Sequence, residues 1–229
     1  MSVLKLVAFD LDGTLVDSAP DLARAVDTAL RELGLPEPGV EEVRAWVGDG
    51  VTRLMQRALI FGLGREPGTA QVEAALKLFS SAYRQHVAVD SRLYPDTLVT
   101  LETLKRSDYR LVCVTNKSEE FTVPLLQALG ILAQFDLVLS GDSLPARKPD
   151  PLPLLHAAER FQLKPAQCCM VGDSRNDMLA ARAAGFVTVA MVHGYHQGED
   201  LAALGAEVLL ESFRELPAFL ASAGPGLAR

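Results

Sequence analysis

The sequence predicts an α/β protein: a Rossmann-like open parallel sheet with an all-helical insertion after its first strand. Two observations predict this fold. Dense apolar runs recur along the chain, and segments of helical periodicity separate them from residue 97 onwards, an alternation that is typical of parallel sheets with helical crossovers. Between residues 18 and 86, in contrast, the apolar residues recur only with a helical period.

The candidate strands are runs in which nearly every residue is apolar, rather than every second one. Because helices cover both faces of a parallel sheet, its strands need no polar face. The runs span residues 3–9, 110–115, 135–140, 168–172, 187–192 and 206–210. Right-handed crossovers between strands are expected through helices over residues 97–105, 119–129, 151–161 and 176–184, and a further helix is expected after the last strand, over residues 213–220.

The insertion begins with an amphipathic helix. Ser18 and Asp21 have the spacing of a capping box at its start, and Gly34 stands where a glycine stop is expected. Further helices are expected over residues 41–47, 51–61 and 69–86.

These patterns divide the chain into two predicted domains. Residues 1–17 and 88–229 form the α/β core, and residues 18–87 form a helical cap. A compact helical module of about 70 residues is small for a domain. Inserted directly after the first strand, it is in a position to act as a lid over the edge of the sheet.

The composition is that of a globular protein. Hydrophobic residues make up 49% and charged residues 22% of the 229 positions, which excludes a disordered chain. The 22 basic residues are scattered and outnumbered by 29 acidic ones, for a net charge of −7. Nucleic acid and anionic membranes are therefore not expected as partners, whereas a small anionic substrate is compatible with local cations.

The sequence also favours a cytoplasmic location. Cys113, Cys168 and Cys169 lie inside apolar runs, as reduced buried thiols do. Asp10 and Asp12 interrupt the apolar start of the chain, which therefore lacks the pattern of a signal peptide. No apolar stretch reaches the ~18 residues of a membrane span. We expect a monomer or a homodimer.

A pair of carboxylates follows the first predicted strand, in the segment Asp10-Leu11-Asp12-Gly13-Thr14. Ligands of open α/β sheets gather at the carboxyl ends of the strands. Two carboxylates so close together resist joint ionisation unless a cation is near, and oxygen ligands suit Mg²⁺. The alternative is a surface turn, because Asp-Gly-Thr is also ordinary turn chemistry.

Three later segments strengthen the functional interpretation. An apolar strand ends at Thr115, a basic segment contains Lys148, and a later strand ends in an acidic pair, Asp173 and Asp177. Each signal is common by itself, since many strands end in threonine and Ser174 with Asp177 also has capping-box spacing. In this order, however, the four segments resemble the haloacid dehalogenase superfamily of phosphatases.

The resemblance implies a role for each of these residues. Asp10 would attack phosphorus to give an aspartyl-phosphate, and Asp12 would exchange protons with the leaving group and with water. Thr115 and Lys148 would bind the phosphoryl oxygens. Mg²⁺ would be bound by the metal set Asp10, Asp12 (through its backbone carbonyl) and Asp173, with Asp177 behind it.

Within the superfamily, the chain is most similar to the phosphoglycolate phosphatases. The similarity lies in Trp46-Val47-Gly48-Asp49-Gly50, Thr115-Asn116-Lys117, Gly141-Asp142-Ser143-Leu144-Pro145 and His193-Gly194-Tyr195. It implies that 2-phosphoglycolate is the substrate. The further substrate-binding candidates are Asn116, the cap glycines Gly48 and Gly50, and three cations that could pair with a carboxylate: Arg53, Lys117 and Arg175.

Three alternatives remain at this point. A dehalogenase would not keep an acid at Asp12, so that residue counts against it. An enzyme similar to β-phosphoglucomutase, acting on a sugar phosphate, would share Asp10 and Asp12 and differ in the cap. A non-catalytic phosphate-binding module could lose either aspartate without harm, and this chain has both.

Overall fold

A six-stranded parallel sheet forms the centre of the computed structural model, which describes residues 3–222. The strand order is β5-β4-β1-β6-β7-β8, and every neighbouring pair is parallel. The predicted α/β fold is thus confirmed. The strands are β1 (Leu6–Phe9), β4 (Arg110–Val114), β5 (Leu137–Leu139), β6 (Cys168–Gly172), β7 (Val187–Met191) and β8 (Val208–Leu210).

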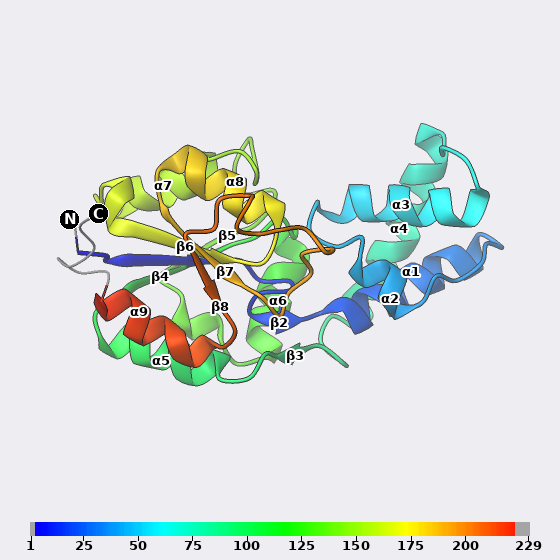
Figure 1. Ribbon diagram of the computed structural model, residues 1–229. Helices are drawn as coiled ribbons and strands as arrows, with labels where there is room; N and C mark the ends of the chain where they lie inside the picture. Colours follow the sequence, from blue (N-terminus) through cyan, green and yellow to red (C-terminus); the bar gives the residue numbers. More distant parts are fainter. Residues whose placement is uncertain (1–2, 223–229) are drawn as a thin grey trace.

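Helices cover both faces of this sheet (Figure 1). One face packs against α5 (Thr97–Arg106), α6 (Glu119–Ala128) and α9 (Leu216–Ser222), and the other against α7 (Leu152–Arg160) and α8 (Arg175–Ala184). In β1, Val7 and Phe9 enter the first layer while Leu6 and Ala8 enter the second. Since both faces of the sheet are buried, the sequence of the strand is a continuous apolar run.

The strand order indicates which edge of the sheet is expected to bind a ligand. The chain runs from central β1 outwards through β4 and β5, and then returns to β6 on the other side of β1. In open α/β sheets, ligands bind at the carboxyl ends of the strands where the order reverses. In Figure 1 this edge faces the helices α1–α4.

Four helices pack together beside that edge, and we call them the helical unit: α1 (Ala19–Glu32), α2 (Val40–Arg44), α3 (Val51–Leu63) and α4 (Thr69–Gln85). They enclose an apolar cluster of their own, which includes Val26, Met55 and Phe79. Phe121 and Tyr195 join this cluster from outside the unit. As the sequence predicts, the described chain has no strand between residues 18 and 86.

A two-stranded antiparallel sheet joins the helical unit to the rest of the molecule. It consists of β2 (Val16–Asp17) and β3 (Arg92–Leu93). Strands of two residues are too short for a periodic signal, and the sequence analysis did not predict them. The two connections to the helical unit therefore pass side by side.

The predicted capping box of α1 is wrong, although the predicted stop is correct, since Gly34 has a φ of +71°. The Ser18 hydroxyl makes no cap bond; it donates to Asp12 Oδ1 at 2.5 Å. Asp21 accepts the backbone N–H groups of Asp90 and Ser91, at 2.7–3.0 Å. Partners outside the helix thus take both side chains away from the helix end: Asp12, six residues before Ser18, and the segment of Asp90 and Ser91, about 70 residues after Asp21.

The structure also bears on two simpler expectations. Cys113, Cys168 and Cys169 are buried and form no disulfide. None of the helices within residues 3–222 has the length and apolar character needed to cross a bilayer.

Candidate active site

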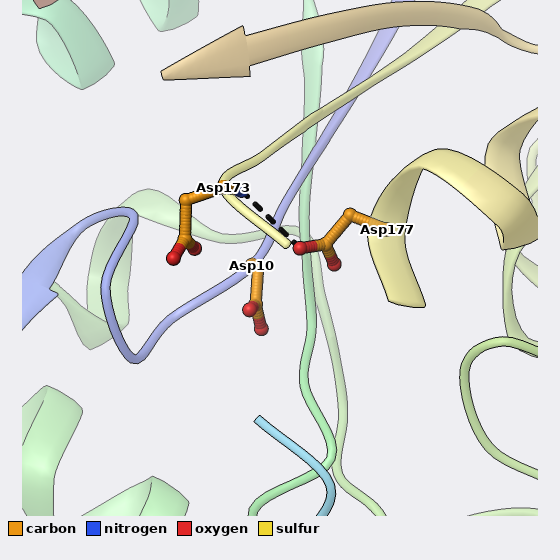
Figure 2. Close-up of side chains that lie close together, drawn as sticks. All are labelled: Asp10, Asp173 and Asp177. Atoms are coloured by element: carbon orange, nitrogen blue, oxygen red, sulfur yellow. Dashed lines mark hydrogen bonds between the residues drawn. The ribbon is translucent and has the colours of Figure 1, made fainter. Parts of the chain in front are cut away.

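Three carboxylates meet at the edge where β1 and β6 end. Asp10 follows β1, Asp173 follows β6, and Asp177 lies in the first turn of α8. Each contributes an oxygen to a group whose members lie within 4.8 Å of one another, and Figure 2 shows the three side chains gathered there. All are at most 7% exposed. Such an oxygen-only donor set suits a hard divalent cation.

Lys148 neutralises part of this cluster. Its Nζ lies 2.8 Å from Asp10 Oδ1 and 2.6 Å from Asp177 Oδ1, and the residue is only 3% exposed. Three carboxylates and one ammonium leave two negative charges, the complement of a divalent cation. The residues therefore fit a metal of that charge.

Burial dominates the electrostatics of the cluster. It raises the pKa of Asp10 to about 7, against the opposing effect of Lys148. Burial, with the charges of Asp177 and Asp10, also raises the pKa of Asp173 well above its usual range. For Lys148, burial by itself lowers the pKa, but Asp10 and Asp177 outweigh it and raise the pKa. A cation beside the carboxylates would favour their charged forms.

Asp177 has little capacity left for a metal. Its Oδ1 accepts from Lys148, and its Oδ2 accepts from the backbone N–H groups of Asp173 and Ser174 and from the Ser174 hydroxyl at 2.6–3.2 Å. The side chain therefore orients Lys148 and the turn after β6. Asp173 is held differently: Thr14 Oγ1 donates to its Oδ1 at 2.5 Å, and Tyr195 N–H donates to its Oδ2 at 2.6 Å.

Asp12 points to a different partner. Lys117 Nζ donates to its two carboxylate oxygens at 2.9 and 3.1 Å, and the Ser18 hydroxyl donates to Oδ1. The turn between Asp12 and β2 needs glycine at position 13, because φ is +88° and a Cβ there would lie 2.4 Å from Asp173 Oδ2. The Asp12 carboxylate is thus not part of the cluster of three carboxylates and forms a separate ion pair with Lys117.

Thr115 and Asn116 follow β4 and lie at the same edge. Both are at most 7% exposed. The Thr115 hydroxyl accepts from Lys117 N–H at 3.1 Å, and no group in residues 3–222 accepts its own proton, which it can offer to another acceptor. The Asn116 amide donates to Gly48 O at 3.0 Å and to Lys148 O at 2.9 Å. Asn116 therefore connects this edge of the sheet with the loop between α2 and α3 of the helical unit.

The loop between α2 and α3 reaches the core through Gly48 and Gly50. Gly48 O accepts from Asn116 and, at 3.2 Å, from Asn176. A Cβ on Gly50, whose φ is +84°, would lie 2.8 Å from a guanidinium nitrogen of Arg147. Glycine at position 50 thus permits both the left-handed backbone and the close approach of the two parts.

A pocket lies between the helical unit and the edge of the sheet. The core contributes Asp10, Asp12 and the segment 115–118, and the loop contributes Gly48 and Gly50. The rest of its wall is mainly apolar: Leu22, Val47, Val51, Leu54, Phe79, Tyr83 and Phe121. The structure thus brings seven of the residues singled out in the sequence to one pocket or its edge: Asp10, Asp12, Gly48, Gly50, Thr115, Asn116 and Lys117.

Two of the three candidate cations lie outside the lining of this pocket. Arg53 is exposed and donates to Gln56 on the same helix. Arg175 is exposed and forms an ion pair with the half-buried Glu199, with 2.7 Å between the guanidinium nitrogen and the carboxylate oxygen. Lys117 is the predicted cation that lines the pocket.

Sequence reasoning assigned no role to Tyr195, which connects the metal cluster with the junction. Its backbone N–H donates to Asp173. Its hydroxyl accepts the N–H groups of Ser18 and Ala19 at 2.9 and 3.0 Å and donates to Asp17 Oδ1 at 2.6 Å. The phenol thus caps α1, the function that Ser18 does not perform. No local pattern reveals this, since the partners are more than 170 residues apart.

Replacing Tyr195 with Phe is expected to lower the free energy of unfolding by about 1–3 kcal/mol, because buried N–H groups lose their acceptor. Denaturant unfolding measures the loss. Tyr109→Phe is the matched control, because no hydrogen bond of the Tyr109 hydroxyl is found within residues 3–222, and it should change stability by less than about 0.5 kcal/mol. Equal stabilities of the two variants would contradict the capping role.

Comparison with known proteins defines the class. A family model described as "Hydrolase: haloacid dehalogenase-like hydrolase" matches residues 4–185. The chain belongs to the haloacid dehalogenase-like hydrolases, which confirms the resemblance seen in the sequence.

More particular similarities are to phosphoglycolate phosphatases. The chain is 45% identical to that of Nitrosospira multiformis over 93% of both chains. It is 43% identical to that of Nitrosococcus oceani over 96% of this chain and 97% of the relative. A crystal structure of a predicted phosphoglycolate phosphatase from Haemophilus somnus superposes with a TM-score of 0.91 at 36% identity, covering 96% of this chain and 99% of that one.

Proposed function

We propose that this enzyme is a Mg²⁺-dependent phosphatase that hydrolyses 2-phosphoglycolate to glycolate and phosphate. The observation that carries the proposal is the pocket in which Asp10 and Asp12, on separate ion pairs, face the same space between core and helical unit. A nucleophile and a proton carrier are the two groups that a two-step phosphoryl transfer needs.

In the first step, a carboxylate oxygen of Asp10 attacks phosphorus. The bond from phosphorus to the leaving oxygen breaks while Asp12 donates a proton to that oxygen. In the second step, water attacks the phosphorus of the aspartyl-phosphate, Asp12 takes the proton of the water, and the bond to Asp10 breaks. Inorganic phosphate leaves, and both aspartates return to their original forms.

The positions of Thr115 and Lys148 support a role in binding phosphate. Lys148 already contacts Asp10, so its ammonium lies where charge develops on the phosphoryl oxygens. Thr115 offers a hydroxyl proton from the end of the neighbouring strand. Asn116 holds the backbone of Lys148 and so supports its placement.

The metal in this proposal is Mg²⁺, bound by Asp10, Asp173 and the backbone carbonyl of Asp12. The oxygen-only donor set and its residual charge of two support that choice. When bound, the ion reduces the repulsion between an anionic nucleophile and an anionic phosphate. Asp177 acts indirectly in this arrangement, through Lys148 and the turn after β6.

We assign residues 18–87 the role of a cap. The helical unit contributes most of the apolar pocket wall and is attached through the paired connections at β2 and β3. Such an arrangement can open for substrate and exclude water on closing. The Gly48–Gly50 loop, bonded to Asn116 and Asn176, would be the contact that closure makes.

The substrate is proposed from two supports. The relatives over almost the full chain are phosphoglycolate phosphatases, and Lys117 supplies a cation in the pocket for a carboxylate next to the phosphate. Apolar side chains around it offer a hexose few hydrogen-bonding partners.

A panel of phosphate esters at constant Mg²⁺ tests the assignment. The kcat/KM for 2-phosphoglycolate is expected to exceed that for hexose phosphates at least tenfold, or ~1.4 kcal/mol of transition-state binding. A panel led by a sugar phosphate, or conversion of β-glucose 1-phosphate to the 6-phosphate without release of phosphate, would contradict the assignment. Absence of any Mg²⁺-dependent phosphate release would favour a binding module.

A further inference from the structure

The Tyr83 hydroxyl is a buried polar group with an open hydrogen bond in the substrate pocket. Tyr83 belongs to α4, lines the pocket and is 0% exposed. Within residues 3–222, no group accepts its proton, and the neighbour that interacts with its oxygen is the Lys117 ammonium. A buried hydroxyl whose proton has no acceptor destabilises the fold, so its presence calls for a partner that binds from solution.

The neighbour of Tyr83 cannot accept its proton. The Lys117 ammonium lies 4.9 Å from the centre of the Tyr83 ring, and an ammonium is a donor only. Burial raises the pKa of Tyr83 to about 12, which the charge of Lys117 partly opposes. The phenol is therefore protonated at neutral pH and offers its O–H to an acceptor.

Lys117 also has capacity for a ligand. Two contacts to Asp12 use two of its three N–H bonds, and the third lies on the side of Tyr83, with which it forms no well-aligned hydrogen bond. Apart from the catalytic edge, the wall around the pair is apolar, with Leu22, Leu54 and Phe79 among its members. Two donors in an apolar wall, one of them charged, are complementary to an anionic acceptor and bind it strongly because little water competes.

We propose that Tyr83 and Lys117 together bind the carboxylate of the leaving group, and that Tyr83 is a specificity-determining residue on the helical unit. This inference rests on the proposed function and deepens it. Lys117 lies between Asp12, which serves the leaving oxygen, and Tyr83. In 2-phosphoglycolate a single methylene separates the leaving oxygen from the carboxylate. The leaving oxygen can therefore lie next to Asp12 while the carboxylate lies next to Lys117 and Tyr83.

The test uses two non-hydrolysable ligands and calorimetric binding to the Mg²⁺-loaded protein. 3-Phosphonopropionate carries the carboxylate, and propylphosphonate has a methyl group in its place. Tyr83→Phe is expected to weaken the first about tenfold, or 1.4 kcal/mol, and to change the second less than twofold. Tyr109→Phe, the matched control outside the pocket, should leave both affinities unchanged.

Thermal unfolding supplies a second readout. Because Tyr83→Phe removes an unsatisfied hydroxyl, the Tm of the free protein should stay equal or rise. A lower Tm with equal weakening of both ligands would show a structural role and overturn the inference.

The wild-type protein separates the two proposals. If it prefers 3-phosphonopropionate and Tyr83→Phe keeps the whole preference, only the role of Tyr83 fails. If the wild type binds both ligands equally, the carboxylate site fails, and the assignment of 2-phosphoglycolate fails with it.

Discussion

Replacing Asp10 with Asn is expected to reduce kcat at least about a thousandfold, the scale seen when a covalent nucleophile is removed. The amide has nearly the same shape as the carboxylate but cannot attack phosphorus. Steady-state phosphate release from 2-phosphoglycolate, with an aryl phosphate as second substrate, measures the loss. Both substrates should be affected equally, because the nucleophile is common to them.

The fold should survive this change. Asp10 lies with Asp173 and Asp177 in a buried cluster, and burial raises its pKa, so the folded state disfavours its charge. A neutral isostere should therefore leave the Tm unchanged or higher, although one contact of Lys148 is lost. A folded Asp10→Asn protein with activity within tenfold of wild type, free of contaminating enzyme, would remove Asp10 from the role of nucleophile.

Removing divalent metal is the second change with a large expected effect. Chelation by EDTA should abolish phosphate release, and added Mg²⁺ should restore it, because Asp10, Asp173 and Asp177 form an anionic site that repels a phosphate dianion. Mg²⁺ should also raise the Tm, since a ligand that binds the folded state stabilises it. Full activity in thoroughly demetallated protein would favour the dehalogenase alternative.

Asp173→Ala locates the metal more closely. It removes an anionic oxygen, so the Mg²⁺ concentration for half-maximal activity should rise about tenfold or more, as the loss of one charge-assisted contact implies. The rise in Tm with Mg²⁺ should shrink in parallel. Glu159→Ala, on the exposed face of α7, should change neither value. An unchanged Mg²⁺ requirement in Asp173→Ala would exclude Asp173 as a ligand.

The regular part of the fold was predictable because its signals are local. Each predicted strand from residue 110 onwards overlaps a strand of the sheet, and the four predicted helices of the insertion coincide with α1–α4. β2 and β3 were not predicted, since two residues carry no period. The predicted capping box failed for a different reason. The Ser18 hydroxyl donates to Asp12 and the Asp21 carboxylate accepts from Ser91, so neither side chain is left to cap α1.

Some residues of the candidate site could likewise be predicted from local sequence, and others could not. Asp10, Asp173 and Thr115 were identifiable because each directly follows an apolar strand, and parallel strands end at a common edge. Arg53 and Lys117 were equal candidates for a carboxylate by charge. Only the packing of the helical unit decides between them, with Lys117 in the pocket and Arg53 on the surface.

The sequence by itself determined the α/β class, the place of the helical insertion and the carboxylates at the strand ends, because periodicity and strand-end position depend on neighbouring residues. Tertiary structure alone decided that Asp12 pairs with Lys117, that Tyr195 caps α1, and that Tyr83 presents an open hydroxyl to the pocket. The first two are contacts between segments far apart in the chain, and the third depends on which groups the fold places around Tyr83. The partner of each polar group is decided only by folding, which excludes water and determines which groups lie next to one another.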